Sequence, residues 1–295
     1  MNNKRRLFST LLCVAALTAG LFVSGCGSDK AGGIGSVVSS VVDGGSDEKA
    51  AAKLNTLIDA TNRFNGDNAT WGQNYADSLA KLKGGFQEGA IGRQPHYDTL
   101  KEALEQSKKE GSTFKEVDTE RDNVLNVLNE LVPTFKDLKA YDDSKAYMND
   151  GGAKGKELAA KYVAQVEKFD AAYAKFNDAL NKANTEQTKK QIEKLKKDGK
   201  KGYAAAMEST LRLTTLVENV EKAPRNADKQ AVEKELNEIQ TLLKSINNDR
   251  GEVLVNSYNS VVGSVRQVLT DANENNLNDM IENFNNYIES YNNTT

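Results

Sequence analysis

Large apolar side chains recur at alternating steps of three and four residues over most of this chain, and this spacing limits the fold more than any other feature. Such a period places the side chains on one face of an α-helix, where a neighbouring helix can bury them. The clearest stripe consists of Leu158, Tyr162, Val166, Phe169, Tyr173, Phe176 and Leu180. No segment of the body shows the two-residue alternation of a half-buried strand. The sequence therefore predicts an all-α fold.

Turn-forming residues divide the periodic region into separate helices. Glycines and a proline between Gly84 and Pro95 separate two early stripes from a short helix, and Asn149–Gly152 separates two long helices. The polar residues around Asn184-Thr185 predict another break, before a helix from Ile192 to Val220. Because short links favour antiparallel neighbours, we expect an elongated antiparallel bundle of long amphipathic helices behind a flexible N-terminal tether.

Pro133 lies inside one of the long stripes. A proline within a helix removes one backbone hydrogen bond and clashes with the preceding turn. The sequence therefore predicts a kinked helix at this position.

The N-terminus has the organisation of a secretion signal. Lys4, Arg5 and Arg6 precede an apolar run of 17 residues, from Leu7 to Val23, and small residues follow. The positive charges keep this end on the cytoplasmic side while the apolar run enters the bilayer. We therefore expect the rest of the chain on the extracytoplasmic side, at the periplasmic face or the cell surface.

The sequence Val23-Ser24-Gly25-Cys26 resembles the lipobox of bacterial lipoproteins. The resemblance implies that the thiol of Cys26 receives a diacylglyceryl group and that the bond between Gly25 and Cys26 is cut. The alternatives are an uncleaved membrane helix and an ordinary signal with a chance cysteine. An apolar run of this length is at the short limit for spanning a bilayer. Cys13 leaves with the signal, so the processed chain has no second cysteine for a disulfide.

The chain is thus predicted to have three parts: a signal peptide (1–25), a lipidated Gly/Ser-rich tether (26–47) and a helical domain (48–295). Glycine and serine favour a flexible chain in the tether. Four valines between Val37 and Val42 leave a short strand or helical turn against lipid as an alternative there.

The overall charge disfavours two classes of partner. Removal of Lys4, Arg5 and Arg6 from the 39 basic residues leaves 36, against 42 acidic residues. A chain with this acidic excess is not drawn to nucleic acid or to an anionic membrane by its overall charge. The expected partners are the membrane, through the acylated cysteine, and an envelope protein or a small ligand.

Several segments of the long helices resemble the YiiG-like lipoproteins, a family defined by a domain of unknown function. They are Tyr141–Tyr147, Ala153–Leu158 and the run from Phe169 through Tyr173 to Phe176. The resemblance extends from about Leu54 to Tyr291 and is strongest between Leu131 and Val217. It implies a helical envelope lipoprotein with no known activity, and it carries over no catalytic residues. The glycine-rich segment from Gly84 to Gly92 departs from the family pattern.

The inventory of reactive residues gives little support to catalysis. His96 is the only histidine, whereas zinc sites recruit several histidines or cysteines, so we interpret it as a helix-start residue. The groups Asp142-Asp143 with Asp150, and Asp170 with Asp178, are interpreted as solvated helix faces. No phosphate-binding loop, dinucleotide motif or nucleophile elbow occurs, so no cofactor or catalytic residue is predicted.

Two further features have both a structural and a functional interpretation. Lys190, Lys194, Lys197 and Lys201 are expected on one stripe of one helix, as a solvated face or as a contact for anionic lipid or an acidic partner. The aromatic stripe from Tyr162 to Phe176 is expected in the core, with a ligand groove as the alternative.

The resulting hypothesis is a lipid-anchored, non-enzymatic helical bundle that binds an envelope component. Its rivals are an envelope enzyme whose carboxylates converge only in three dimensions, and a structural spacer. Two close, buried carboxylates in a cleft would favour the enzyme. A spacer would have neither a cleft nor a large exposed apolar patch.

Overall fold

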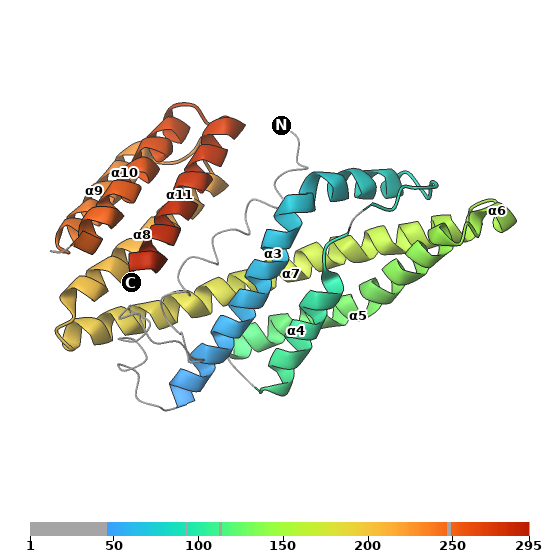
Figure 1. Ribbon diagram of the computed structural model, residues 1–295, viewed down its shortest axis with the longest axis horizontal. Helices are drawn as coiled ribbons and strands as arrows, with labels where there is room; N and C mark the ends of the chain where they lie inside the picture. Colours follow the sequence, from blue (N-terminus) through green and yellow to red (C-terminus); the bar gives the residue numbers. More distant parts are fainter. Residues whose placement is uncertain (1–45, 93, 112–113, 247–248, 295) are drawn as a thin grey trace. The chain divides into compact units, whose positions relative to one another are not determined.

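The computed structural model describes residues 46–92, 94–111, 114–246 and 249–294. Within these ranges all regular structure is helical, which confirms the all-α prediction. The helices are α3 (Ser46–Lys83), α4 (Tyr97–Lys109), α5 (Lys115–Asp143), α6 (Tyr147–Asp150), α7 (Ala153–Lys197), α8 (Lys201–Lys222), α9 (Lys229–Lys244), α10 (Asp249–Thr270) and α11 (Glu274–Thr294) (Figure 1). The predicted signal peptide, Cys26 and most of the predicted tether lie outside the described residues.

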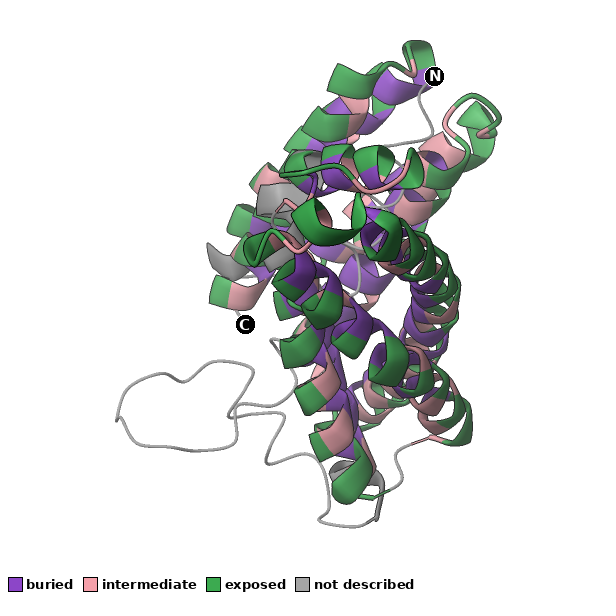
Figure 2. Cartoon of the chain, turned by 90° about the vertical axis from the view of Figure 1, so that its right-hand side faces the viewer, coloured by how far each residue is buried: buried purple, intermediate pink, exposed green. Residues whose placement is uncertain are grey.

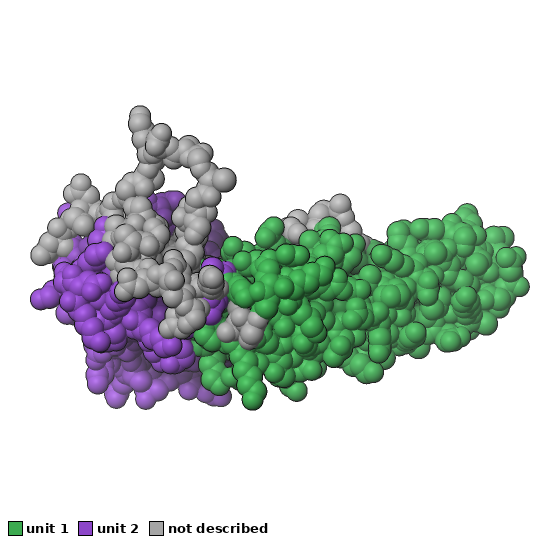
Figure 3. Space-filling model, turned by 90° about the horizontal axis from the view of Figure 1, so that it is seen from below, with its two compact units in different colours: residues 1–12, 53–183 green, residues 13–52, 184–295 purple. Residues whose placement is uncertain are grey.

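The helices divide between two compact units, which Figure 3 distinguishes by colour. Unit 1 contains Lys53–Ala183 and unit 2 contains Asn184–Thr295. The boundary falls inside α7, so this helix contributes its first part to unit 1 and its last part to unit 2. In both units the buried residues follow one side of each helix and the exposed residues the other, as the apolar stripes require (Figure 2).

Aromatic side chains from three helices form the centre of unit 1. Phe169 of α7 lies with its ring centroid 4.9 Å from that of Tyr97, at the start of α4, and 5.8 Å from that of Phe64 on α3. Tyr173, one turn along α7, stacks on Phe169 at 5.1 Å and also contacts Phe64. The aromatic stripe of α7 is therefore core, as predicted. α5 also packs against α7, since the ring centroids of Phe135 on α5 and Tyr162 on α7 lie 5.6 Å apart.

Unit 2 contains an up-and-down four-helix bundle. Each of α8, α9, α10 and α11 packs against the next, and α11 packs back against α8 (Figure 1). Its core contains fully buried residues such as Leu213, Ile239, Val261 and Phe284. Two buried tyrosine hydroxyls form hydrogen bonds between helices. The hydroxyl of Tyr258 donates to the carbonyl of Leu236 at 2.5 Å, and the hydroxyl of Tyr287 lies 2.9 Å from Oγ1 of Thr210. The tyrosines thus bury their rings without leaving these hydroxyl groups unpaired.

The predicted helix break around Asn184-Thr185 is wrong. α7 continues through these residues, because Asn184 and Thr188 are both buried and maintain the four-residue spacing from Leu180 to Ile192. Polar residues thus occupy stripe positions, and an apolar pattern alone does not detect them.

α7 ends instead at Lys197. Gly199 has a φ of +74°, its N–H donates to Lys196 at 3.2 Å, and the N–H of Lys200 donates to Leu195 at 2.9 Å. These two bonds form a Schellman motif, which needs a left-handed residue at this position and so favours glycine. Lys201 is the first residue of α8. The prediction that it shares one helix with Lys190, Lys194 and Lys197 is therefore wrong.

The two apolar stripes that precede Gly84 in the sequence belong to one helix rather than two, since α3 is continuous from Ser46 to Lys83. The stretch between them contains glycine and asparagine but no proline, and such residues weaken a helix without preventing it. The predicted break between Gly84 and Pro95 is confirmed, with positive φ at Gly85 and Gly89. α5 extends on both sides of Pro133, and the kink there stays a prediction.

Candidate functional site

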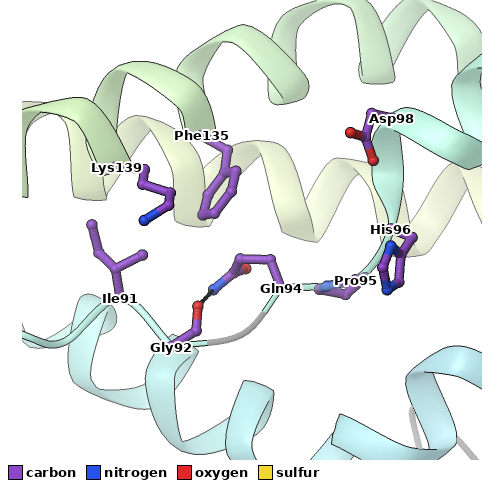
Figure 4. A pocket seen from close by; sticks show the side chains of 8 residues that line it. All are labelled: Ile91, Gly92, Gln94, Pro95, His96, Asp98, Phe135 and Lys139. Atoms are coloured by element: carbon purple, nitrogen blue, oxygen red, sulfur yellow. Dashed lines mark hydrogen bonds between the residues drawn. The ribbon is translucent and has the colours of Figure 1, made fainter. Parts of the chain in front are cut away.

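A cavity in unit 1 lies between the loop that follows α3 and one face of α5 (Figure 4). Its volume is about 460 Å³. Ile91, Pro95 and Phe135 give it an apolar wall, and polar side chains surround them. The full lining is Ile91, Gly92, Gln94, Pro95, His96, Asp98, Phe135 and Lys139. Apolar walls with a few fixed polar groups are typical of small-molecule sites.

Three contacts fix the loop that forms the floor of this cavity. A Cβ atom on Gly92 would overlap the hydroxyl of Ser78 on α3, so a larger residue there would require the Ser78 side chain to move. Gln94 donates from Nε2 to the carbonyl of Gly92 at 3.2 Å, and its Oε1 accepts a hydrogen bond from the hydroxyl of Tyr162 on α7. Both ends of the Gln94 amide are therefore held in place.

Behind Gln94 lies a cluster of three buried tyrosine hydroxyls, from Tyr75, Tyr97 and Tyr162. The hydroxyls of Tyr75 and Tyr97 are 2.8 Å apart. Burial is the main cause that raises the pKa of each phenol well above its ordinary value. The three groups therefore remain neutral at physiological pH and act as hydrogen-bond partners rather than as bases.

Asp170 of α7 is the carboxyl group whose charge reaches this cluster. Its pKa is raised to about 6, mainly by partial burial, while nearby Lys83 opposes the rise and Glu167 adds to it. Its charge also raises the pKa of all three tyrosines. Lys83 itself pairs with Glu167 at 2.9 Å, and both side chains are well exposed. The interpretation of Asp170 and Asp178 as a solvated helix face is confirmed for Asp178, which is exposed, and is wrong for Asp170, which is partly buried. Asp178 lies two turns further along α7, so the two carboxyl groups do not form one buried site.

The charged groups at the rim of the cavity are exposed. Lys139 donates to both carboxylate oxygens of Asp143, one turn along α5, at 3.0 and 2.9 Å. Asp98 accepts a hydrogen bond from the N–H of Thr99 at 3.0 Å. His96 immediately precedes α4, which agrees with its interpretation as a helix-start residue. The rim therefore offers both signs of charge, with the lysine already paired.

The other acidic group from the sequence has a structural role. Asp150 accepts hydrogen bonds from the hydroxyl of Tyr141 at 2.5 Å and from the backbone of Gly152 and Lys154 at 2.9 and 3.2 Å. These bonds, the one from Tyr141 above all, lower the pKa of Asp150. The carboxylate thereby satisfies free N–H groups at the start of α7. Among the described residues no three histidine, cysteine or acidic side chains are grouped as metal ligands would be.

The sequence did not single out Gln94, Phe135 or Lys139. They come from a loop and from α5, and no spacing in the chain joins these segments. The glycines and Pro95 were the available signal, since a loop rich in such residues beside long helices is a common place for a site.

A family model described as "Protein of unknown function (DUF3829)" matches residues 48–291. No curated protein and no solved structure gives a significant match. None of the described helices is long and apolar enough to span a bilayer. The match covers nearly all of the helical region, and the chain therefore belongs to the DUF3829 family of proteins of unknown function.

Proposed function

We propose that this protein is a lipid-anchored binding protein of the bacterial cell envelope and that its helical body acts without catalysis. The observation that carries the anchor is the run Val23-Ser24-Gly25-Cys26 behind a cationic and apolar leader. The resemblance to YiiG-like lipoproteins, a finer assignment than the DUF3829 family, supports the same role. The acyl chains on Cys26 would hold the body on the extracytoplasmic side of a membrane.

Replacement of the acylated cysteine tests the anchor. We expect Cys26→Ser to abolish incorporation of labelled palmitate and to leave the leader attached, because the thiol is the atom that receives the lipid. Labelling in bacterial cells, followed by intact-mass analysis of the product, measures both effects. Cys13→Ser is the matched control, and it should be processed and labelled as the unmodified chain is. Equal labelling of the Cys26→Ser chain would contradict the proposal.

The cavity of unit 1 supports a binding role for the body. Its floor is fixed by Gln94, whose amide is held by Tyr162 and by Gly92, so a ligand would meet groups that are already ordered. Preorganised groups reduce the entropy that binding loses. Phe135 provides a ring against which an apolar part of a ligand can pack.

A bulky residue in the cavity tests this role. Ile91 is half-buried in the lining, so Ile91→Trp should fill the space and displace a ligand. Native mass spectrometry of protein extracted from the envelope in mild detergent should show a bound molecule or a partner subunit that the variant loses. Val253→Trp is the control, because Val253 is 45% exposed on α10 of unit 2. A bound component that the Ile91→Trp variant retains would place binding elsewhere.

The observation that favours the rival, an envelope enzyme, is the raised pKa of Asp170 beside three tyrosine hydroxyls. Acid–base catalysis by two carboxyl groups requires a second one close by, and the nearest acidic neighbour that affects Asp170, Glu167, is exposed and paired with Lys83. We therefore place binding before catalysis.

A further inference from the structure

Positive charge is concentrated where α7 ends and α8 begins. Seven lysines and three acidic residues lie between Glu186 and Lys201. Lys189 pairs with Glu186 at 3.3 Å, and Lys196 pairs with Glu193 at 3.4 Å and with Glu208 at 2.9 Å. The ion pairs of the described chain include none of the other five lysines. We call these five the basic corner: Lys190, Lys194, Lys197, Lys200 and Lys201.

The three lysines of the basic corner on α7 lie on the face opposite to the buried side of that helix, and Lys194 and Lys200 are half-buried. At 3.6 residues per turn, Lys190, Lys194 and Lys197 lie within roughly 60° of one another around α7 and opposite the buried Ile192 and Leu195. Lys190, Lys197 and Lys201 are exposed. The Schellman motif at Gly199 joins the end of α7 to the start of α8. The lysines at the end of α7 and the first lysine of α8 are therefore close together in the sequence.

Helix stability explains only part of this arrangement. The C-terminal end of a helix stabilises cations in its last turn, which accounts for Lys194 and Lys197. Lys190 lies a further turn inside α7, and Lys201 lies at the N-terminus of α8, where the helix dipole disfavours a cation. Like charges three or four residues apart also destabilise a helix. Helix stability therefore does not account for Lys190 and Lys201.

We infer that the basic corner is a docking surface for the head groups of anionic phospholipids. The inference rests on the proposed function, because an acyl anchor on Cys26 would keep the chain near a bilayer. Each lysine close to an anionic surface strengthens partitioning by about fivefold. The attraction acts within about 10 Å at moderate salt, so the corner must approach the head groups closely. This contact would add to the anchor a second, electrostatic attachment through unit 2.

Vesicle binding by a chain that lacks acyl groups tests the inference separately from the anchor. The probe is the processed chain, residues 26–295, with Cys26→Ser. It is sedimented at low salt with vesicles of phosphatidylcholine, or of phosphatidylcholine and phosphatidylglycerol in equal parts. We expect binding to the anionic vesicles alone. The combined change Lys190→Gln, Lys194→Gln, Lys197→Gln and Lys201→Gln, at about fivefold for each lysine, should weaken it by roughly six-hundredfold.

The matched control removes the same number of positive charges from the first part of α7, outside the basic corner. Lys154, Lys161, Lys168 and Lys175 are exposed on the first part of α7, and their joint replacement by glutamine should weaken binding less than about fivefold. Circular dichroism checks that both variants are folded. An equal loss in the two variants, no binding of the Cys26→Ser chain, or an acidic envelope protein captured by the basic corner without vesicle binding would each overturn the inference. None of these outcomes bears on palmitate labelling of Cys26, which tests the anchor alone.

Discussion

The variant Phe169→Ala should lose about 3–5 kcal/mol of the free energy of unfolding of unit 1. Phe169 is 3% exposed, and its ring contacts Phe64 of α3, Tyr97 of α4 and Tyr173 of its own helix. Truncation removes these contacts together and leaves a cavity where three helices meet. Such a cavity can collapse only if a helix moves, so the loss should lie at the upper end of the range for core substitutions.

Urea unfolding measures this loss, and hydrogen exchange by mass spectrometry locates it. Peptides of α3, α4 and α5 should lose protection, whereas those of α9, α10 and α11 should keep it, because unit 2 has its own core. Phe169→Leu is the control, since it retains apolar volume and should cost roughly half as much. A loss below about 1 kcal/mol would contradict the central position of Phe169. Equal loss of protection in both units would contradict their separate packing.

The periodicity of apolar residues predicted most of the fold, because helix burial follows from local spacing. The stripe of α7 illustrates this, since Tyr162, Phe169 and Phe176 are all buried as expected. The pattern failed where polar residues occupy buried positions, as Asn184 and Thr188 do in the middle of α7. It also failed at the end of α7, where a single backbone conformation at Gly199 decides the boundary.

The candidate site could be predicted only in part from the sequence. The glycines after α3 marked the loop, but its position depends on the contact between Gly92 and Ser78 and on the bond between Gln94 and Tyr162. Tyr162 lies 68 residues after Gln94, and tertiary packing alone joins them. The division of the helical region into two units likewise arises from packing, because its boundary lies within one continuous helix.

The variant Asp170→Asn should increase the free energy of unfolding of unit 1 by about 2 kcal/mol near pH 8 and change it little near pH 4. Burial raises the pKa of Asp170 from its ordinary value of 3.8 to about 6. A carboxyl group with a raised pKa stabilises the folded state fully below its unfolded pKa, and this contribution is lost as the pH rises through about 6. The shift corresponds to at most about 3 kcal/mol, which the partial exposure of Asp170 reduces. Asparagine has a similar shape and stays neutral.

Urea unfolding at both pH values measures the difference between the variant and the unmodified chain, so contributions from other titrating groups cancel. Asp178→Asn is the control, because Asp178 is exposed on the same helix and should change stability by less than about 0.5 kcal/mol at either pH. A loss of stability near pH 8 would mean that the carboxylate form of Asp170 is needed for packing. The variant also separates the two functional classes, since a binding protein that uses the cavity should keep its ligand without this charge. A stabilised variant that loses its function would instead indicate that a catalytic role retains Asp170 at the cost of stability.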